Sequence, residues 1–213
     1  MTLGTRLLLL LAGLLALPIA AYAQDDTAEG AEQVAPTAEN GSDELGLSMG
    51  SPGDVAQVGQ TYVLSTHTDW ELRCVKAAEG TDPCQMYQLL RDQQGTAVAE
   101  INLFNLPEGG QAAAGANVVT PLETLLTAQL RLFVDSGEPR RYPYSFCAEY
   151  APEQYGCFAR LGFTSAEIDQ FKRGSTGTVI IVPVAAPKEE VRLTLSLAGF
   201  TAGWDAMVEV NDR

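Results

Sequence analysis

Apolar and polar residues alternate along much of the chain after residue 59, and this two-residue period predicts β-strands. One hairpin is clear. Alternation over 129–135 is followed by the turn residues Asp-Ser-Gly-Glu-Pro at 135–139, and it resumes at Tyr142, Tyr144 and Phe146. We expect further strands at Tyr62–Ser65, Trp70–Val75, Met86–Leu90, Ala97–Phe104, Gly156–Leu161, Thr176–Val184 and Val191–Leu197.

Helical signals are fewer. Thr164-Ser165-Ala166-Glu167 is a capping box, and Lys172-Arg173 followed by Gly174 suits a helix end, so we predict a helix over Ser165–Lys172. A shorter helical turn is expected at 202–207. The segment 121–128 fits either a helix that begins with Pro121 or a loop.

The resulting fold class is mainly β: a disulfide-stapled β-sandwich or barrel-like domain with one or two short helices. We place this domain at 59–207 and a C-terminal tail at 208–213. Trp70 and Trp204, near the two ends of the domain, are expected as core anchors. Gly109, Gly110 and Gly115 are expected to lie in a small-residue loop.

The first 23 residues predict a signal peptide. Arg6 supplies positive charge, Leu7–Leu17 form an apolar run, and Ala21-Tyr22-Ala23 supplies a cleavage site before Gln24. A transmembrane anchor is the competing interpretation, but it needs about 20 apolar residues and this run ends at Pro18. We therefore expect a mature protein with no membrane span, located in the periplasm or secreted.

The next segment, 24–58, is an acidic leader. It contains eight acidic residues and no basic ones, and too few apolar residues to offset the entropy cost of ordering, so we expect it to be disordered. The whole chain has 13 Lys+Arg against 27 Asp+Glu, a formal net charge of −14. A nucleic-acid partner is excluded on this basis, because phosphate binding needs clustered basic residues.

The four cysteines form two equally spaced pairs, Cys74-x9-Cys84 and Cys147-x9-Cys157. In an exported protein such residues are expected to form disulfides. Four cysteines allow three pairings, of which two locally closed bridges are the simplest. Zinc is the alternative, but its knuckles use much shorter spacings, and a redox C-x-x-C pair is missing from the sequence.

Catalytic signals are scarce. His67 is the single histidine, which excludes multi-histidine metal sites, and the sequence contains no G-x-S-x-G nucleophile motif, phosphate-binding loop or dinucleotide motif. We expect no cofactor and no metal. Acidic residues are so abundant that a carboxylate pair is inevitable, and abundance alone does not indicate glycoside hydrolysis.

Two groups of residues are candidates for an interaction surface. Arg131, Arg140 and Arg141 form a basic patch on the predicted hairpin, although strand charges of this kind usually pair with neighbouring acids. Glu149, Tyr150 and Tyr155 lie in a loop, lengthened over 148–154, between Cys147 and Cys157. That loop suits contact with a sugar or a peptide, or is a solvated turn.

The segment His67-Thr68-Asp69-Trp70-Glu71-Leu72-Arg73-Cys74 resembles the opening motif of the invasion-associated locus B (IalB) proteins of α-proteobacteria. The resemblance continues through Cys84, Cys147 and Cys157 to Leu195–Ala206, and thus covers about Thr68 to Met207. His67-Thr68 departs from the Gly or Phe-Gly that usually precedes Asp-Trp. The resemblance implies an exported, envelope-located, β-sandwich-like protein that in some members is associated with entry into host cells, and it carries over no catalytic residue.

The sequence therefore favours a non-enzymatic exported protein that acts by surface contacts with an envelope component or a host macromolecule. Two alternatives stay open. A small periplasmic hydrolase would hold two carboxylates across a pocket, and a small-ligand carrier would have a dry apolar cavity inside the β-fold.

Overall fold

The structure, a computed structural model, describes residues 56–212. The predicted signal peptide and the acidic leader up to residue 55 lie outside the described residues. The strands are β1 Thr61–His67, β2 Trp70–Val75, β3 Cys84–Arg91, β4 Ala97–Asn105, β5 Ala114–Thr120, β6 Leu130–Val134, β7 Arg140–Tyr142, β8 Tyr144–Ala151, β9 Gln154–Phe163, β10 Thr176–Ile181 and β11 Val191–Ser196. The helices are α1 Ser165–Arg173 and α2 Phe200–Asn211, with a 3-10 turn at Leu126–Ala128.

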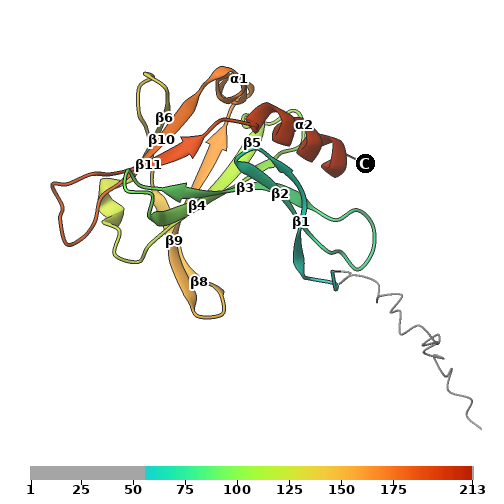
Figure 1. Ribbon diagram of the computed structural model, residues 1–213, viewed down its shortest axis with the longest axis horizontal. Coiled ribbons are helices and arrows are strands. Elements are labelled where there is room, and N and C mark those ends of the chain that lie inside the picture. Colours follow the sequence, from blue (N-terminus) through green and yellow to red (C-terminus); the bar gives the residue numbers. More distant parts are fainter. Residues whose placement is uncertain (1–55, 213) are drawn as a thin grey trace, which may run out of the picture. The chain divides into compact units, whose positions relative to one another are not determined.

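All strands belong to one antiparallel sheet with the order β7-β6-β10-β11-β3-β4-β5-β9-β8, and β2 and β1 extend it from β3. Only Pro143 separates β7 from β8, so the two ends of this path are consecutive in the chain. The sheet therefore curls into a nearly closed barrel (Figure 1). The mainly-β prediction is confirmed, and of its two architectures the barrel-like one is present.

Pro143 also corrects the predicted hairpin. Leu130–Val134 pairs with Arg140–Tyr142 as expected, but Tyr144 and Phe146 belong to β8, which pairs with β9 instead. Proline has no backbone N–H to donate to a ladder, so the strand breaks at this residue and changes partner. The alternation over 142–146 thus crosses from one strand pair to another.

Strand β5 was not predicted, because its sequence, Ala-Gly-Ala-Asn-Val-Val-Thr, is small and lacks clear alternation. The expectation that Gly115 lies in a loop is therefore wrong. Both faces of β5 are mostly buried, and small residues fit where neighbours approach closely. A Cβ on Gly115 would lie 2.5 Å from the ring of Phe104 on β4, so only glycine fits there.

The capping box of α1 is confirmed: the Glu167 N–H donates to the Thr164 hydroxyl, and the Glu167 carboxylate accepts from the Thr164 N–H. Helix α2 is longer than the predicted turn and runs to Asn211, into the residues expected as a tail. The segment 121–128 is a loop with one 3-10 turn at its end.

Aromatic rings run through the core in a continuous series. Edge-to-face contacts link Trp70 to Phe200, Phe200 to Phe171, Phe171 to Phe163, and Phe163 to Tyr142. The series joins both helices to the sheet, and Trp70 is only 1% exposed. Trp204 is half-buried against the same core.

The sheet is weakest between β3 and β11, where the register has a single pair, Thr194 with Arg91. The side chain of Gln88 supplies the missing backbone bonds. It donates to the Ser196 carbonyl at 3.0 Å and accepts from the Ser196 N–H at 2.7 Å. The indole N–H of Trp70 donates to the same carbonyl at 2.9 Å.

Candidate binding surface

Both disulfides are local: Cys74 bonds to Cys84 and Cys147 to Cys157. Each bridge joins two residues that are direct cross-strand partners, in β2–β3 and in β8–β9. Of the three possible pairings, the simplest is the one present. The first bridge is buried, whereas Cys147 of the second is exposed.

The second bridge clasps a hairpin that projects from the barrel (Figure 1). Strands β8 and β9 continue to Ala151 and Gln154, so the segment 148–154, expected as a lengthened loop, is mostly strand. Only Pro152 and Glu153 connect them, and Glu153 adopts a φ of 61° in the turn. The side chains that sequence analysis placed in a loop are thus held on an ordered hairpin.

Three large aromatic side chains are exposed on this hairpin: Phe146 at 50%, Tyr150 at 43% and Tyr155 at 55%. Phe158 holds two of them in place. Its ring stacks on Phe146 with centroids 4.8 Å apart and meets Tyr150 edge to face at 5.8 Å. The hairpin tip also carries Glu149 and Glu153, and residues 144–159 include no Lys or Arg.

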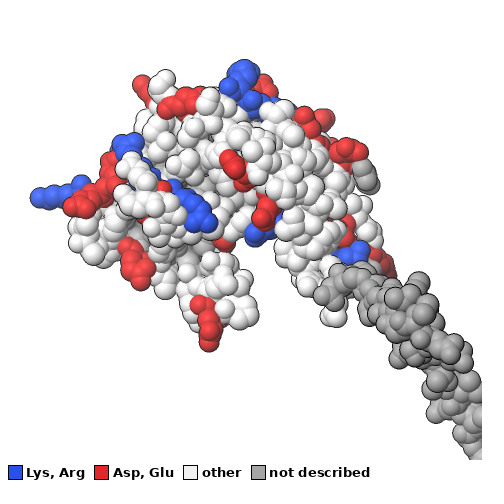
Figure 2. Space-filling model, viewed as in Figure 1, with Lys and Arg blue, Asp and Glu red and all other residues white. Residues whose placement is uncertain are grey.

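Beside the hairpin lies a sheet face that neither helix of residues 56–212 covers. We call it the open face; it is formed by the half-exposed side chains of Arg73, Tyr87, Glu100, Asn102 and Asn117 on β2 to β5. Their neighbours in each strand point into the core instead, and the helices pack there. In Figure 2 the molecule is hollowed between the β8–β9 hairpin and the β1–β2 edge.

The hairpin tip and the open face enclose a cleft of about 260 Å³, which we call the hairpin cleft. Its lining includes Leu89 of β3, Glu100 of β4, Val119 of β5, and Tyr150 and Tyr155 of the hairpin. Tyr87 lies next to Glu100 and donates its hydroxyl proton to Oε2 at 3.1 Å. The guanidinium of Arg73 lies over the Tyr87 ring, 3.2 Å from the centroid.

Glu100 also acts electrostatically on the tyrosines around it. The pKa of Tyr87 is raised by desolvation first and then by the negative charge of Glu100. The pKa of Tyr150 is raised in the same way, by burial first and then by Glu100. Both phenols are protonated at neutral pH, and the Tyr87 hydroxyl uses its proton in the hydrogen bond to Glu100.

Gly156 sets the width of the hairpin cleft. A Cβ at this position would lie 2.4 Å from Cγ1 of Val119 and 3.1 Å from the Thr120 carbonyl oxygen. The absence of a side chain lets the hairpin approach β5, and it leaves room for the Tyr150 ring, whose Cε1 would be 3.4 Å away.

We expect Gly156→Ala to lower the free energy of unfolding by about 1–3 kcal/mol, because overpacking must push β9 away from β5. Gly162→Ala on the same strand is the control, since its Cβ would meet only the Ala112 Cβ at an ordinary 3.6 Å. Urea unfolding followed by circular dichroism measures both variants. Equal stability of the two would contradict the close packing at Gly156.

The basic patch lies elsewhere on the barrel. Arg131 pairs with Glu190 at 2.7 Å, Arg140 pairs with Glu167 of α1, and Arg141 is exposed with no ion pair among residues 56–212. Arg141 lies on β7, which pairs with β6, whereas Tyr150 lies nine residues later on β8, which pairs with β9. The structure thus separates the two predicted groups, and each stays a prediction as an interaction surface.

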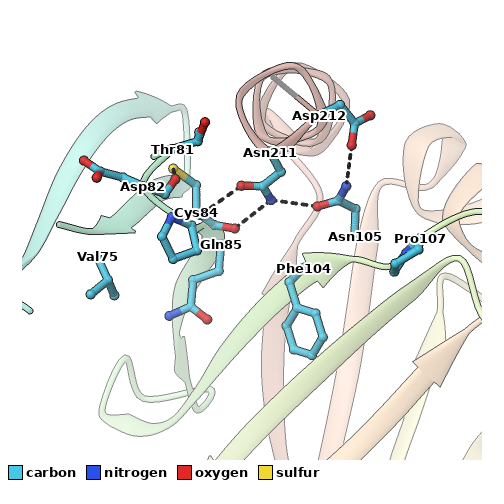
Figure 3. Close-up of a pocket in the computed structure, with 11 residues that line it drawn as sticks. Val75, Thr81, Asp82, Cys84, Gln85, Phe104, Asn105, Pro107, Asn211 and Asp212 are labelled. Carbon is cyan, nitrogen blue, oxygen red and sulfur yellow. Dashed lines mark hydrogen bonds between the residues drawn. The ribbon is translucent and has the colours of Figure 1, made fainter. Parts of the chain in front are cut away.

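A larger pocket, of about 670 Å³, lies at the end of the sheet beside the first disulfide (Figure 3). Asn211 of α2 reaches into it. The Cys84 N–H donates to Oδ1 of Asn211, and the Asn211 amide donates to the Cys84 carbonyl at 3.0 Å and to Oδ1 of Asn105 at 2.7 Å. These amides hold the helix end to β3 and β4.

The carboxylate of Asp82 in this pocket also accepts hydrogen bonds from its neighbours. Its Oδ1 accepts from the Ala77 N–H at 2.9 Å and its Oδ2 from the Tyr62 hydroxyl at 2.8 Å. The backbone hydrogen bond from Ala77, followed by the one from Tyr62, lowers the pKa of Asp82. A carboxyl group with a lowered pKa is ionised at neutral pH and is not suited to general-acid catalysis.

His67 does not join a nucleophilic triad in this geometry. Its Nε2 lies 2.9 Å from the Ser65 hydroxyl, but Asp69 accepts from the Ser196 hydroxyl rather than from the histidine. Among the described residues, no three His, Cys, Asp or Glu side chains gather as a metal site. In the same part of the chain, no helix is long and apolar enough to cross a membrane.

Sequence analysis missed the contribution of Glu100 and Leu89 to the hairpin cleft. The alternation in β3 and β4 indicates that both point away from the core, because their neighbours Leu90 and Ile101 point inward. It does not indicate which hairpin lies over them. Only the pairing of β5 with β9 brings Tyr150 and Tyr155 to these strands.

Comparison with known proteins gives one consistent result. The family model described as "Invasion associated locus B (IalB) protein" matches residues 70–208. The crystal structure of invasion associated protein b from Bartonella henselae is similar, with a TM-score of 0.56 and 18% sequence identity, over 70% of this chain and 98% of that one. Among curated proteins, none matches this chain.

Proposed function

We propose that this chain, which belongs to the invasion associated locus B family, is an exported envelope protein that acts by binding rather than by catalysis. Its partner is an envelope component or a host macromolecule, and the contact is made by the β8–β9 hairpin and the open face beside it. The two disulfides support export, because such bonds persist outside the cytosol.

The observation that carries this proposal is the exposure of Phe146, Tyr150 and Tyr155 on one projecting hairpin. Clustered exposed aromatic residues are typical of protein-binding surfaces, where a few rigid side chains supply most of the binding energy. The disulfide holds the hairpin, and the packing of Phe158 orders the rings of Phe146 and Tyr150 before any partner arrives. Little entropy is then lost on binding.

The hydrolase alternative has weaker support. Among the described residues, Glu100 is the single carboxylate that lines the hairpin cleft, and Asp82 in the larger pocket accepts hydrogen bonds from Tyr62, Ala77 and Lys76. The carrier alternative needs a dry internal cavity, whereas packed side chains such as Trp70, Phe163 and Phe200 fill the barrel interior.

Site-specific photocrosslinking tests the binding role. We expect a photoreactive phenylalanine at Tyr155 to form a defined adduct in cells or on host cells, and the same probe at exposed Glu189 to form none. The yield of this adduct should fall at least fivefold when the substitutions Phe146→Ala and Tyr150→Ala are added. Equal labelling from both positions would contradict the proposal.

Export is tested separately by mass spectrometry of the fractionated protein. The expected N-terminus is Gln24, in a periplasmic or secreted fraction. Protein that stays in the cytosol with residues 1–23 attached would contradict this part of the proposal.

A further inference from the structure

We propose that the hairpin cleft is a receptor for a positively charged side chain, an arginine or lysine presented by a protein partner. This inference rests on the proposed binding function and names the chemistry of the contact. It follows from the groups that line the cleft and from the charge around it.

The cleft offers one carboxylate with an unused oxygen. Oε2 of Glu100 accepts from Tyr87, while Oε1 has no hydrogen-bond donor among the described residues. Glu100 is half-buried between Leu89 and Val119, its register partners on β3 and β5. A charge-assisted hydrogen bond to such a carboxylate is stronger than one between neutral groups.

Two aromatic side chains share the cleft with that carboxylate. Tyr150 and Tyr155 line the same cleft as Glu100, and within residues 56–212 no Lys or Arg lies over either ring. Cations bind favourably over tyrosine rings. The open face already contains one such cation–π contact, because the guanidinium of Arg73 lies over the ring of Tyr87, next to Glu100.

The surroundings are complementary to a cation. Among the described residues, Glu100 is the single charged one that lines the cleft, and Glu149 and Glu153 add negative charge at the hairpin tip. The nearby cation, Arg73, is paired with Glu71 at 2.7 Å. A volume of about 260 Å³ admits one long side chain rather than a whole domain. Leu89 and Val119 provide apolar contacts for the methylene groups of an arginine or lysine.

A peptide titration tests this inference. The probes are Gly-Gly-Arg-Gly-Gly with blocked termini and the same peptide with citrulline, which keeps the shape of arginine and loses its charge. Two-dimensional NMR of the oxidised protein in 0.15 M salt measures both. We expect the arginine peptide to shift signals of β4 and the hairpin with a Kd on the order of 1 mM, and citrulline to bind at least tenfold more weakly.

Matched variants separate the cleft from the overall acidity of the chain. Glu100→Gln should weaken arginine binding about tenfold, and Tyr150→Ala or Tyr155→Ala about three- to fivefold, with thermal unfolding confirming that each variant folds. Glu189→Gln removes the same charge from an exposed position outside the cleft and should leave binding unchanged. Equal losses for Glu100→Gln and Glu189→Gln would overturn the inference.

Equal binding of the citrulline peptide would overturn the inference too. Binding of a neutral chitin oligosaccharide in the cleft, without binding of the arginine peptide, would also overturn it.

The experiments distinguish a failure of this inference from a failure of the proposed function. A crosslinked partner at Tyr155 with no arginine binding removes the inference and keeps the binding role. Arginine binding with no partner-specific adduct removes the proposed function instead.

Discussion

Replacing Trp70 by alanine is expected to lower the free energy of unfolding by about 4 kcal/mol, the range for removing a fully buried aromatic side chain. Trp70 is 1% exposed and begins the ring series that ties α2 to the sheet through Phe200. The Ser196 carbonyl that accepts from its indole keeps a second donor, Gln88. Most of the loss therefore comes from the cavity and not from an unpaired carbonyl.

Two further variants test whether the loss of stability comes from the cavity. Trp70→Phe preserves most of the buried area and should cost about half as much, and Trp204→Ala, at a half-buried position, about 1–2 kcal/mol. Urea unfolding followed by far-ultraviolet circular dichroism gives all three values. A loss at Trp70→Ala no larger than at Trp204→Ala would contradict the central position of this ring.

Removing the Cys74–Cys84 bridge, which is buried at both ends, should cost more than removing the Cys147–Cys157 bridge, of which only Cys157 is buried. Both disulfides join residues 10 apart, so each restricts the unfolded chain equally, by about 3 kcal/mol on the loop-entropy model. They differ in the folded state: Cys74 and Cys84 are buried in the core, whereas Cys147 is exposed. Emptied core volume adds about 1 kcal/mol for the first pair.

The comparison uses Cys74→Ala/Cys84→Ala and Cys147→Ala/Cys157→Ala, which leave no unpaired thiol from the bridge removed. We expect losses of about 4 and about 3 kcal/mol in denaturant titrations of the oxidised proteins. The second variant should also lose partner binding, since the bridge clasps the aromatic hairpin. A larger loss of stability for the Cys147–Cys157 pair would contradict the assigned burial.

Much of the fold could be predicted from local patterns. The capping box at Thr164–Glu167 is a contact between residues three apart, and strand alternation reports only which face of a strand is buried, so both are readable without knowing the fold. The equal cysteine spacing indicated local bridges and allowed two other pairings.

Secondary-structure prediction was wrong where residues distant in the sequence, and not the local pattern, decide the conformation of a segment. Strand β5 consists of small residues with no clear period, and it forms because it pairs with β4 and β9 and the Phe104 ring fills the space that Gly115 leaves. Tyr144 and Phe146 continue the alternation of the preceding strand, but the strand breaks at Pro143 and the residues after it pair with a different strand. Each of these outcomes depends on residues outside the local pattern.

The sequence by itself determined most of the strands, the capping box of α1 and the equal spacing of the cysteines, and it identified Tyr150 and Tyr155 as candidates for contact. Only the tertiary structure decided that Glu100 lies with them, because strands β3, β4 and β5 must be ordered beside β9 before these side chains can line one cleft. Local patterns report the direction of a side chain relative to its own strand. Long-range strand pairing determines what that side chain meets.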